Sequence, residues 1–218
     1  MSDDHSHRHP PQADHPQPVS HYEWLGVALN DLLIEKGLYT ADELRDMIAE
    51  VEAVDPATHG ARVVARAWTD AHYRARLLQD ANSAVEELGF DSATTDLTVL
   101  ENTPQVHNVV VCTLCSCYPR TLLGRPPTWY KSFPYRSKAV SDPRGALADL
   151  GYTAPEDIEL RVVDSTADCR YLIIPRRPAG TEGWSEEKLV ALVVRDSMIG
   201  VGDALSPAEY EASAALAE

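Results

Sequence analysis

Apolar residues recur at every third or fourth position in the first third of the chain, a spacing that predicts amphipathic helices. The first predicted helix holds Trp24 to Leu33 and ends near Gly37, and Thr40 with Glu43 forms a capping box that opens the second. Because these helices are apolar on one side only, they need the rest of the chain or another subunit to pack on. Three shorter helices are expected after interruptions at Pro56 and Gly60: over 63–68, over 73–78 with Asp70 as N-cap, and over 81–88 before Gly89.

The pattern changes near Gly89, where β-branched runs replace the helical spacing. The elements expected beyond it do not alternate regularly as βαβ units. The predicted fold class is therefore α+β, with a helical N-terminal arm followed by a mixed α/β layered domain. The expected strands are 97–100, 106–112, 158–163 and 170–175, with a turn at 102–104, and the expected helices run from Asp142 to Gly151 and from Ser185 through the inward Leu189, Leu192, Val193 and Met198.

Composition separates the two ends of the chain from its middle. Residues 1–20 are rich in His and Pro and carry no apolar repeat, which predicts a disordered tail; weak collection of metal ions is the alternative. Residues 21–88 form the predicted helical arm and residues 89–202 the α+β domain. Residues 203–218 are acidic and Ala-rich and are expected to be a frayed C-terminal tail.

Charge excludes some functions. A net charge of −15 argues against binding to a nucleic-acid backbone, which requires clustered Lys and Arg. No run of about 18 apolar residues predicts a membrane span, and the N-terminus lacks the apolar core of a secretory signal. The four cysteines are crowded three and one, unlike a disulfide framework, which favours a cytoplasmic protein.

Three of those cysteines, Cys112, Cys115 and Cys117, form a C-x2-C-x-C pattern after a β-branched run and before Pro119. We call residues 112–117 the cysteine turn. Three thiols on one tight turn can face a single point, and a soft metal ion suits them. The turn is therefore the candidate site around which the other elements are interpreted.

Several chemistries fit this spacing. A structural zinc site needs four ligands, and there is no second cysteine pair; Cys169 is a possible fourth ligand, and His107 lies five residues upstream on an expected strand. A disulfide within the turn would close a small, strained ring, and a C-x-x-C redox pair would leave Cys117 unexplained. Alternatively, the deprotonated amides of Ser116 and Cys117 could join their flanking thiolates in a square plane, which requires trivalent cobalt or iron. Spacing alone ranks zinc or a generic thiolate site ahead of this arrangement.

Four segments carry a family resemblance that changes this ranking. They resemble the α subunit of nitrile hydratases, in a superfamily shared with the γ subunit of thiocyanate hydrolase, and the likeness runs from about Tyr22 to Gly202. The segments are Val-Cys-Thr-Leu-Cys-Ser-Cys-Tyr-Pro (111–119), Leu-Gly-Arg-Pro-Pro-Thr-Trp-Tyr-Lys-Ser (123–132), Arg-Pro-Ala-Gly-Thr-Glu-Gly-Trp-Ser (177–185) and Arg-Asp-Ser-Met-Ile-Gly-Val (195–201).

The resemblance implies a lyase that hydrates a nitrile to its amide at a low-spin, non-corrin cobalt(III) centre, with non-haem iron(III) as the alternative. The implied ligands are Cys112, Cys115, Cys117 and the amides of Ser116 and Cys117, and Thr113 and Tyr118 favour cobalt. In the family, the residues matching Cys115 and Cys117 become sulfinate and sulfenate. Cys115, Ser116 and Cys117 are the implied catalytic residues, with either the metal as Lewis acid or the Cys117 sulfenate oxygen as nucleophile.

The resemblance also implies partners. A β-type nitrile hydratase subunit, as one chain or two, would supply arginines to the oxidised cysteines and contact the Ser116 hydroxyl. A cobalt-delivery activator protein and a small-molecule nitrile complete the expected set. The isolated chain is accordingly expected to be poorly active.

Two departures from the family pattern leave other functions open. Arg120 stands where nitrile hydratases usually carry Trp and where thiocyanate hydrolase γ subunits carry Arg, and the segment 90–98 lacks the usual glutamine. Thiocyanate hydrolysis to carbonyl sulfide and ammonia is therefore one alternative, and a non-enzymatic zinc-binding interaction protein is another. A three-subunit nitrile hydratase, such as the one acting on the nucleoside antibiotic toyocamycin, would combine these features.

The remaining candidates have structural interpretations. Aromatic residues after a proline turn are more often core or interface than pocket lining. Charges at element ends more often cap or pair than catalyse. On these grounds Trp129 and Tyr130 are assigned to core or interface, Arg170, Arg176 and Arg177 to the surface or a subunit contact, Asp164 and Asp196 to caps or pairs, and Cys169 to a buried small hydrophobe.

Overall fold

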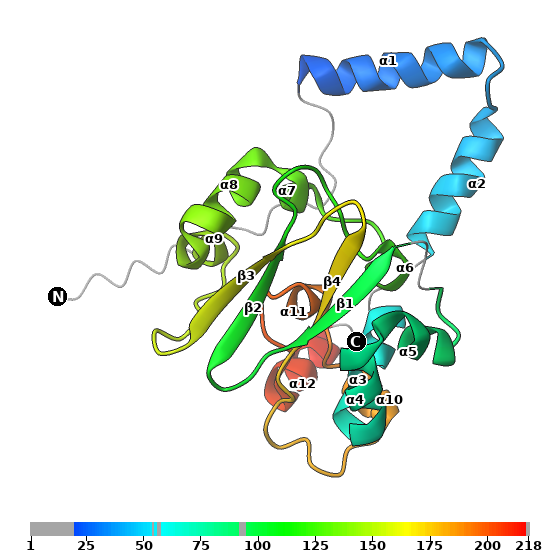
Figure 1. The fold of residues 1–218 in the computed structure, drawn as a ribbon. Coiled ribbons are helices and arrows are strands. Elements are labelled where there is room, and N and C mark those ends of the chain that lie inside the picture. Colours follow the sequence, from blue (N-terminus) through cyan, green and yellow to red (C-terminus); the bar gives the residue numbers. More distant parts are fainter. Residues whose placement is uncertain (1–19, 54, 56–57, 92–94, 217–218) are drawn as a thin grey trace.

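The computed structural model describes residues 20–53, 55, 58–91 and 95–216, so the predicted His- and Pro-rich tail lies outside the described residues. The two first helices, α1 (His21–Glu35) and α2 (Ala41–Glu52), stand off the body of the molecule as an arm (Figure 1). The predicted capping box of Thr40 and Glu43 is present, and Gly37 ends α1 with a φ of 68°. A helical arm therefore precedes the body, while the predicted bounds of the arm, residues 21–88, remain a prediction.

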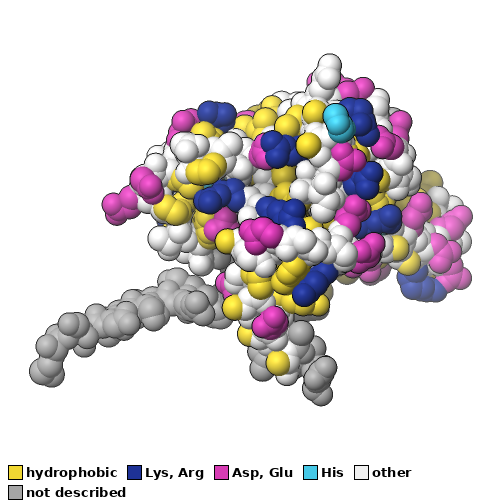
Figure 2. Space-filling view, turned by 90° about the horizontal axis from the view of Figure 1, so that it is seen from below, with side chains coloured by type: hydrophobic (Ala, Val, Ile, Leu, Met, Phe, Trp, Pro, Cys, Tyr) yellow, Lys and Arg dark blue, Asp and Glu magenta, His cyan; other side chains and the backbone are white. Residues whose placement is uncertain are grey.

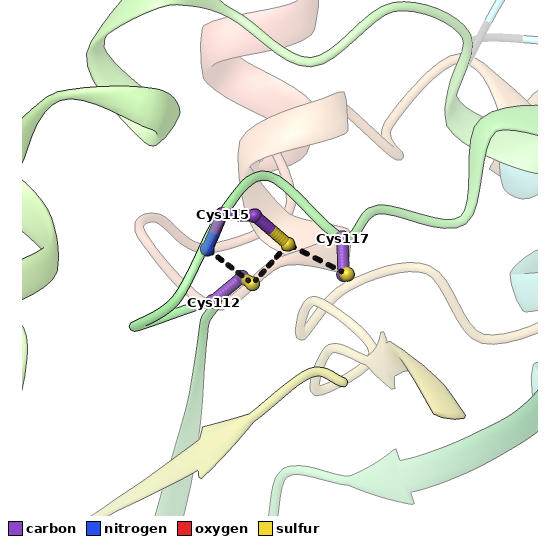
Figure 3. A group of neighbouring side chains, drawn as sticks. All are labelled: Cys112, Cys115 and Cys117. Atoms are coloured by element: carbon purple, nitrogen blue, oxygen red, sulfur yellow. Dashed lines mark hydrogen bonds between the residues drawn. The ribbon is translucent and has the colours of Figure 1, made fainter. Parts of the chain in front are cut away.

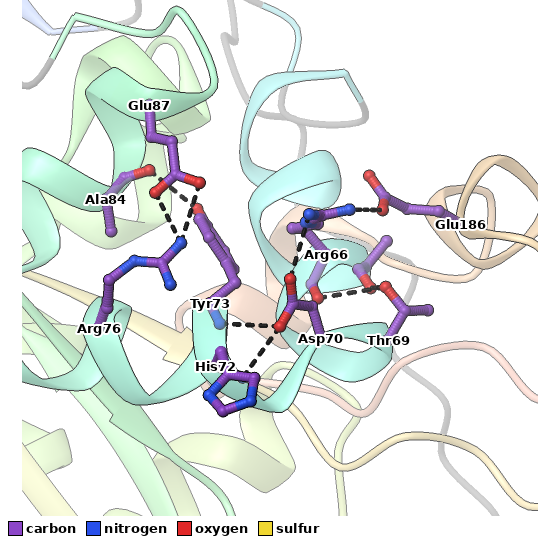
Figure 4. Close-up of polar contacts among 10 residues, drawn as sticks. Arg66, Thr69, Asp70, His72, Tyr73, Arg76, Ala84, Glu87 and Glu186 are labelled. Carbon is purple, nitrogen blue, oxygen red and sulfur yellow. Dashed lines mark hydrogen bonds and ion pairs between the residues drawn. The ribbon is translucent and has the colours of Figure 1, made fainter.

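The next three helices, α3 (His59–Thr69), α4 (Ala71–Gln79) and α5 (Ala81–Glu87), pack against the body. Asp70 caps α4 as predicted, accepting hydrogen bonds from the backbone N–H groups of His72 and Tyr73, and it also pairs with Arg66 (Figure 4). Gly60 was predicted to interrupt the helices, which is wrong. It lies inside α3, where a Cβ would come within 2.7 Å of Leu123 and Met198, so glycine permits close packing there.

Four strands in the described part of the chain form two parallel pairs. β1 (Asp96–Glu101) pairs with β4 (Cys169–Ile174), and β2 (Val106–Val111) pairs with β3 (Glu159–Asp164). β1 and β2 follow each other in sequence but do not pair with each other. In their connection, the Asn102 side chain accepts a hydrogen bond from the Asn108 N–H. A parallel pair needs a long crossover, and between β2 and β3 it holds α6 (Arg120–Leu123), α7 (Thr128–Lys131), α8 (Phe133–Ser141) and α9 (Pro143–Asp149).

The C-terminal part differs from the sequence prediction in two places. The single helix expected from Ser185 is divided into α10 (Glu186–Val190) and α11 (Arg195–Met198), because Val194 is extended and the Leu192 carbonyl accepts the Leu205 N–H. The expected frayed tail contains a helix, α12 (Pro207–Leu216). Its Tyr210 packs with Leu205 against a buried cluster of Ala65, Leu189 and Leu192, and this tertiary contact supports the helix.

Buried apolar residues concentrate on β2, where Val109, Val110 and Val111 are at most 1% exposed. The Val110 N–H donates to the Ile199 carbonyl behind α11, which holds the end of β2 in the core.

The α+β fold class is confirmed, whereas the division of the chain into four segments remains a prediction. Within the described residues, no helix combines the length and apolarity that crossing a bilayer requires. On the face drawn in Figure 2, basic and acidic side chains are interspersed, with no uniformly basic patch.

Candidate metal centre

The cysteine turn leaves β2 immediately after Val111 and brings its three thiols together (Figure 3). The Sγ atoms of Cys112 and Cys115 are 3.4 Å apart, and those of Cys115 and Cys117 are 3.1 Å apart. Cys112 and Cys117 are buried, whereas Cys115 is exposed, and all are free thiols. The convergence predicted from the spacing is thus present, with one thiol accessible from outside.

Side chains from distant elements hold this turn. Asp164, at the end of β3, accepts a hydrogen bond from the Thr113 N–H at 2.9 Å and one from the Thr113 hydroxyl at 2.5 Å. Arg136 of α8 donates to the Thr113 carbonyl at 3.2 Å. The hydroxyl of Tyr130, on α7, donates to the Cys117 carbonyl at 2.9 Å. Hydrogen bonds with residues of β3, α7 and α8 therefore fix the backbone of the cysteine turn, so the positions of the thiols do not depend on the turn alone.

A cavity of about 330 Å³ opens beside the turn. Two guanidinium side chains, those of Arg120 and Arg170, line it together with the cysteines, so it combines thiols with positive charge. The sequence analysis assigned Arg170 to the surface or a subunit contact and did not place it here. Only the β1–β4 register reveals its position, because Arg170 faces Leu97 across that pair. The lining residues are Thr95, Leu97, Cys115, Ser116, Cys117, Tyr118, Pro119, Arg120, Thr121 and Arg170.

The three thiols do not share one environment. Hydrogen bonds from the Cys117 and Cys112 thiols and from the Ser116 N–H lower the pKa of Cys115 to about 7. Burial raises the pKa of Cys117 to about 12, and its hydrogen bonds to Cys115 and Cys112 act in the same direction. Of these two thiols, the exposed Cys115 therefore ionises more readily than the buried Cys117. Burial also raises the pKa of Tyr130, so its hydroxyl remains a proton donor toward Cys117.

The two residues considered as a fourth zinc ligand lie elsewhere. His107 is 3% exposed, and its ring nitrogens bond to Asn102 and to the Gly200 carbonyl. Cys169 contacts the Thr98 hydroxyl at 3.4 Å and is outside the thiol cluster found among the described residues. A closed four-ligand structural zinc site therefore lacks its fourth side chain in that part of the chain.

The other residues considered as site candidates have structural roles. Trp129 and Tyr130 are buried in an aromatic cluster with Tyr135, which confirms the core assignment. Arg177 donates to Thr181 and to the Trp68 carbonyl. Asp196 pairs with Arg195. Asp164 has a role that the sequence did not reveal, because its partner Thr113 is 51 positions away.

The donor set itself indicates which ions fit. Three thiols within 4.8 Å of one another, with the amides of Ser116 and Cys117 between two of them, offer soft sulfur donors from one side of a cavity. Such donors favour transition-metal ions over calcium or magnesium. The residues present therefore fit a thiolate-bound transition metal that keeps a position open toward the cavity.

Comparison with known proteins gives consistent matches. The family model "Nitrile hydratase, alpha chain" matches residues 20–202. The α subunit of the high-molecular-weight cobalt-containing nitrile hydratase of Rhodococcus rhodochrous is 47% identical over 199 residues, covering 90% of this chain and 98% of that one. The thiocyanate hydrolase γ subunit of Thiobacillus thioparus is 41% identical over 197 residues, covering 85% of this chain and 81% of that one.

Solved structures agree with the sequence matches. A double mutant of the iron-type nitrile hydratase of Comamonas testosteroni Ni1 superposes with a TM-score of 0.78 and is 41% identical, covering 87% of this chain and 94% of that one. A recombinant thiocyanate hydrolase with partially modified cobalt centres has a TM-score of 0.72 and is 38% identical, covering 87% and 96%. Each superposition therefore covers most of this chain and nearly all of the solved one.

Proposed function

Because the chain belongs to the nitrile hydratase α-chain family, we propose that it is the metal-bearing catalytic subunit of a cobalt nitrile hydratase, which hydrates a nitrile to the amide. The observation that carries this proposal is the thiol cluster of Cys112, Cys115 and Cys117 opening onto a cavity. Relatives named as cobalt-containing nitrile hydratases, at 47% and 49% identity, favour cobalt over the iron of the Comamonas neighbour.

The proposed ligands are the thiolates of Cys112, Cys115 and Cys117 with the amide nitrogens of Ser116 and Cys117. Cobalt(III), when bound, supplies a Lewis acid for a nitrile or a water molecule. Cys115 and Cys117 are the proposed sites of oxidation to sulfinate and sulfenate. The exposure of Cys115 and its pKa of about 7 support this for that thiol, because thiolate character and access govern oxidation.

The proposed partner is a β-type subunit that covers the arm and the cysteine turn. Nitrile hydratase α subunits form complexes with β subunits, and this arm has an uncovered apolar surface: Trp24, Leu25 and Leu29 are each at least half exposed. Leu114, at the tip of the cysteine turn, is 86% exposed. Exposed apolar patches mark interaction sites, and this one lies on the arm. The single exposed Leu114 lies between two of the proposed ligands, Cys112 and Cys115. A cobalt-delivery activator protein is the second proposed partner.

Thiocyanate hydrolysis is the second candidate function. The observation that favours it is the pair of guanidinium groups, Arg120 and Arg170, on the cavity that also holds Cys115 and Cys117. Two positive charges attract an anionic substrate more strongly than a neutral nitrile. Identity to the cobalt nitrile hydratases is higher than to the thiocyanate hydrolase γ subunit, and this places nitrile hydration first.

The test is an assay of the complex purified with its partner subunits. We expect amide from a nitrile, about one cobalt ion per chain, and a 112–117 peptide carrying one sulfinate and one sulfenate. Carbonyl sulfide from thiocyanate without amide from nitriles would establish the second candidate. Zinc without cobalt, and an unoxidised peptide, would indicate a zinc-binding interaction protein instead.

A matched pair of variants tests the ligand assignment. Cys115→Ala is expected to abolish tight cobalt binding, because it removes the thiol that lies within 3.4 Å of both others. Cys169→Ala removes a thiol outside the cluster and should retain full cobalt content. We propose a cytoplasmic location, because cysteines crowded three and one along the sequence are unlike the disulfide framework of a secreted domain.

A further inference from the structure

Two tyrosine hydroxyls hold the backbone on either side of the cysteine turn. Tyr135 donates to the Val110 carbonyl at 2.8 Å, on β2 before the turn, and Tyr130 donates to the Cys117 carbonyl at 2.9 Å, at its end. Both rings are buried, at 6% and 0% exposure, and they pack on each other with centroids 5.9 Å apart. The two bonds are therefore similar in chemistry and burial but differ in what they hold.

Only the Tyr130 bond ends on a member of the thiol cluster. Its acceptor belongs to Cys117, whose Sγ lies 3.1 Å from that of Cys115. The Tyr130 ring also packs edge-on against Tyr118, with centroids 5.1 Å apart, and Tyr118 is the next residue in the chain and lines the same cavity. Hydroxyl and ring together fix the main chain at the third cysteine.

Placement of Cys117 depends on such a constraint from outside the turn. Residues 114 and 115 of the turn are exposed and give Cys117 no support. Its support comes from the core, where Cys117 and Tyr118 are buried and Tyr118 packs on Tyr130. The other braces, Asp164 and Arg136, both act on Thr113 near the start of the turn. A site whose ligands are held in their binding geometry loses less entropy when it binds.

We propose that Tyr130 is a positioning residue for the metal centre, whose hydroxyl fixes the Cys117 main chain so that its thiol points toward Cys112 and Cys115. The identity of the metal in this inference rests on the proposed function, whereas the placement of the thiol does not. Tyr130 acts through the backbone of Cys117 and needs no contact with substrate or metal.

The test compares Tyr130→Phe with Tyr135→Phe, which removes an equally buried hydroxyl–carbonyl bond from the same aromatic cluster. The first readout is the rate at which an alkylating reagent modifies Cys117 in the metal-free full chain, measured by peptide mass spectrometry. The second is the rate of cobalt release to a chelator from the complex, followed by the cobalt–thiolate absorption. We expect Tyr130→Phe to raise both rates by about fivefold, the factor that a typical buried hydrogen bond represents, and Tyr135→Phe to leave both nearly unchanged.

The outcomes separate this inference from the proposed function. Equal effects of the two variants, or no effect of Tyr130→Phe, would overturn the positioning role. Loss of the cooperative thermal transition in Tyr130→Phe alone would also overturn it, because the hydroxyl would then support the whole core. If the wild-type complex binds no cobalt, the proposed function fails, and the alkylation rates still decide the role of Tyr130.

Discussion

At the residue scale, Thr113 shows how a motif residue can have a second role. In the sequence it favoured cobalt through the family resemblance. In the structure both its N–H and its hydroxyl donate to Asp164, and its carbonyl accepts from Arg136. The cysteines were predictable because they are adjacent in sequence, whereas Asp164, Arg136 and Arg170 were not, because only tertiary packing brings them to the turn.

Removing the brace at Thr113 should weaken metal retention. Asp164→Ala deletes both acceptors, and we expect a loss of about 1–2 kcal/mol of stability together with reduced cobalt content. Asp168→Ala, which removes an exposed carboxylate on the connection between β3 and β4, is the matched control and should change neither. Metal analysis and chemical denaturation provide the measurements. Unchanged cobalt content in Asp164→Ala would show that the turn keeps its shape without this carboxylate.

The pKa values of the turn predict a pH profile for its chemistry. In the metal-free chain, Cys115 should become reactive toward iodoacetamide as the pH rises through about 7, because its pKa is lowered to about 7 and the thiolate is the nucleophile. Cys117 should react far more slowly over the same range, since burial raises its pKa to about 12. Peptide mass spectrometry resolves the two. In denaturant the difference should vanish, and its persistence there would contradict an origin in the fold.

At the element scale, local signals were the most predictable. The capping box of Thr40 and the N-caps of Asp70 and Asp142 lie within three residues of the N–H groups they serve, and all three are present. Strand pairing was not predictable, because each partner lies tens of residues away and an irregular set of helices hides the crossover. The same holds for Gly60, whose reason for being glycine is the distant Leu123 and Met198.

The contact between α11 and β2 predicts a glycine that cannot be replaced. A Cβ on Gly200 would lie 1.8 Å from the Asn108 carbonyl oxygen, and its φ is +77°. We expect Gly200→Ala to cost more than about 3 kcal/mol in unfolding free energy, because overpacking adds to the backbone strain. Gly180→Ala, with a φ of +79° and no atom within 4 Å, isolates the strain at about 1–2 kcal/mol. Equal costs in chemical denaturation would exclude the overpacking.

At the scale of the whole molecule, the arm and the body differ in how far their apolar residues are buried. The body has a buried apolar core, whereas α1 has no buried residue despite its apolar composition. The spacing of apolar residues predicted that the helix needs a surface to pack on, since helical periodicity is a local property. The spacing could not show whether that surface belongs to the body or to another subunit. The structure leaves α1 clear of the body (Figure 1), so the apolar side is available to a partner.

The exposed apolar side of α1 predicts that substitutions there can abolish subunit assembly without lowering the thermal stability of the body. Replacing Trp24, Leu25 and Leu29 together by Ser should abolish co-purification with the β-type subunit, because their exposed apolar area drives the association. The thermal transition of the body should be nearly unaffected, since none of the three is buried in the chain. Glu35→Ala, an exposed polar change on the same helix, is the control and should assemble normally. Size-exclusion chromatography of co-expressed subunits measures the first effect and calorimetry the second. Undiminished assembly of the triple variant would place the subunit contact on the body, while a lowered transition temperature would mean that α1 packs on its own chain.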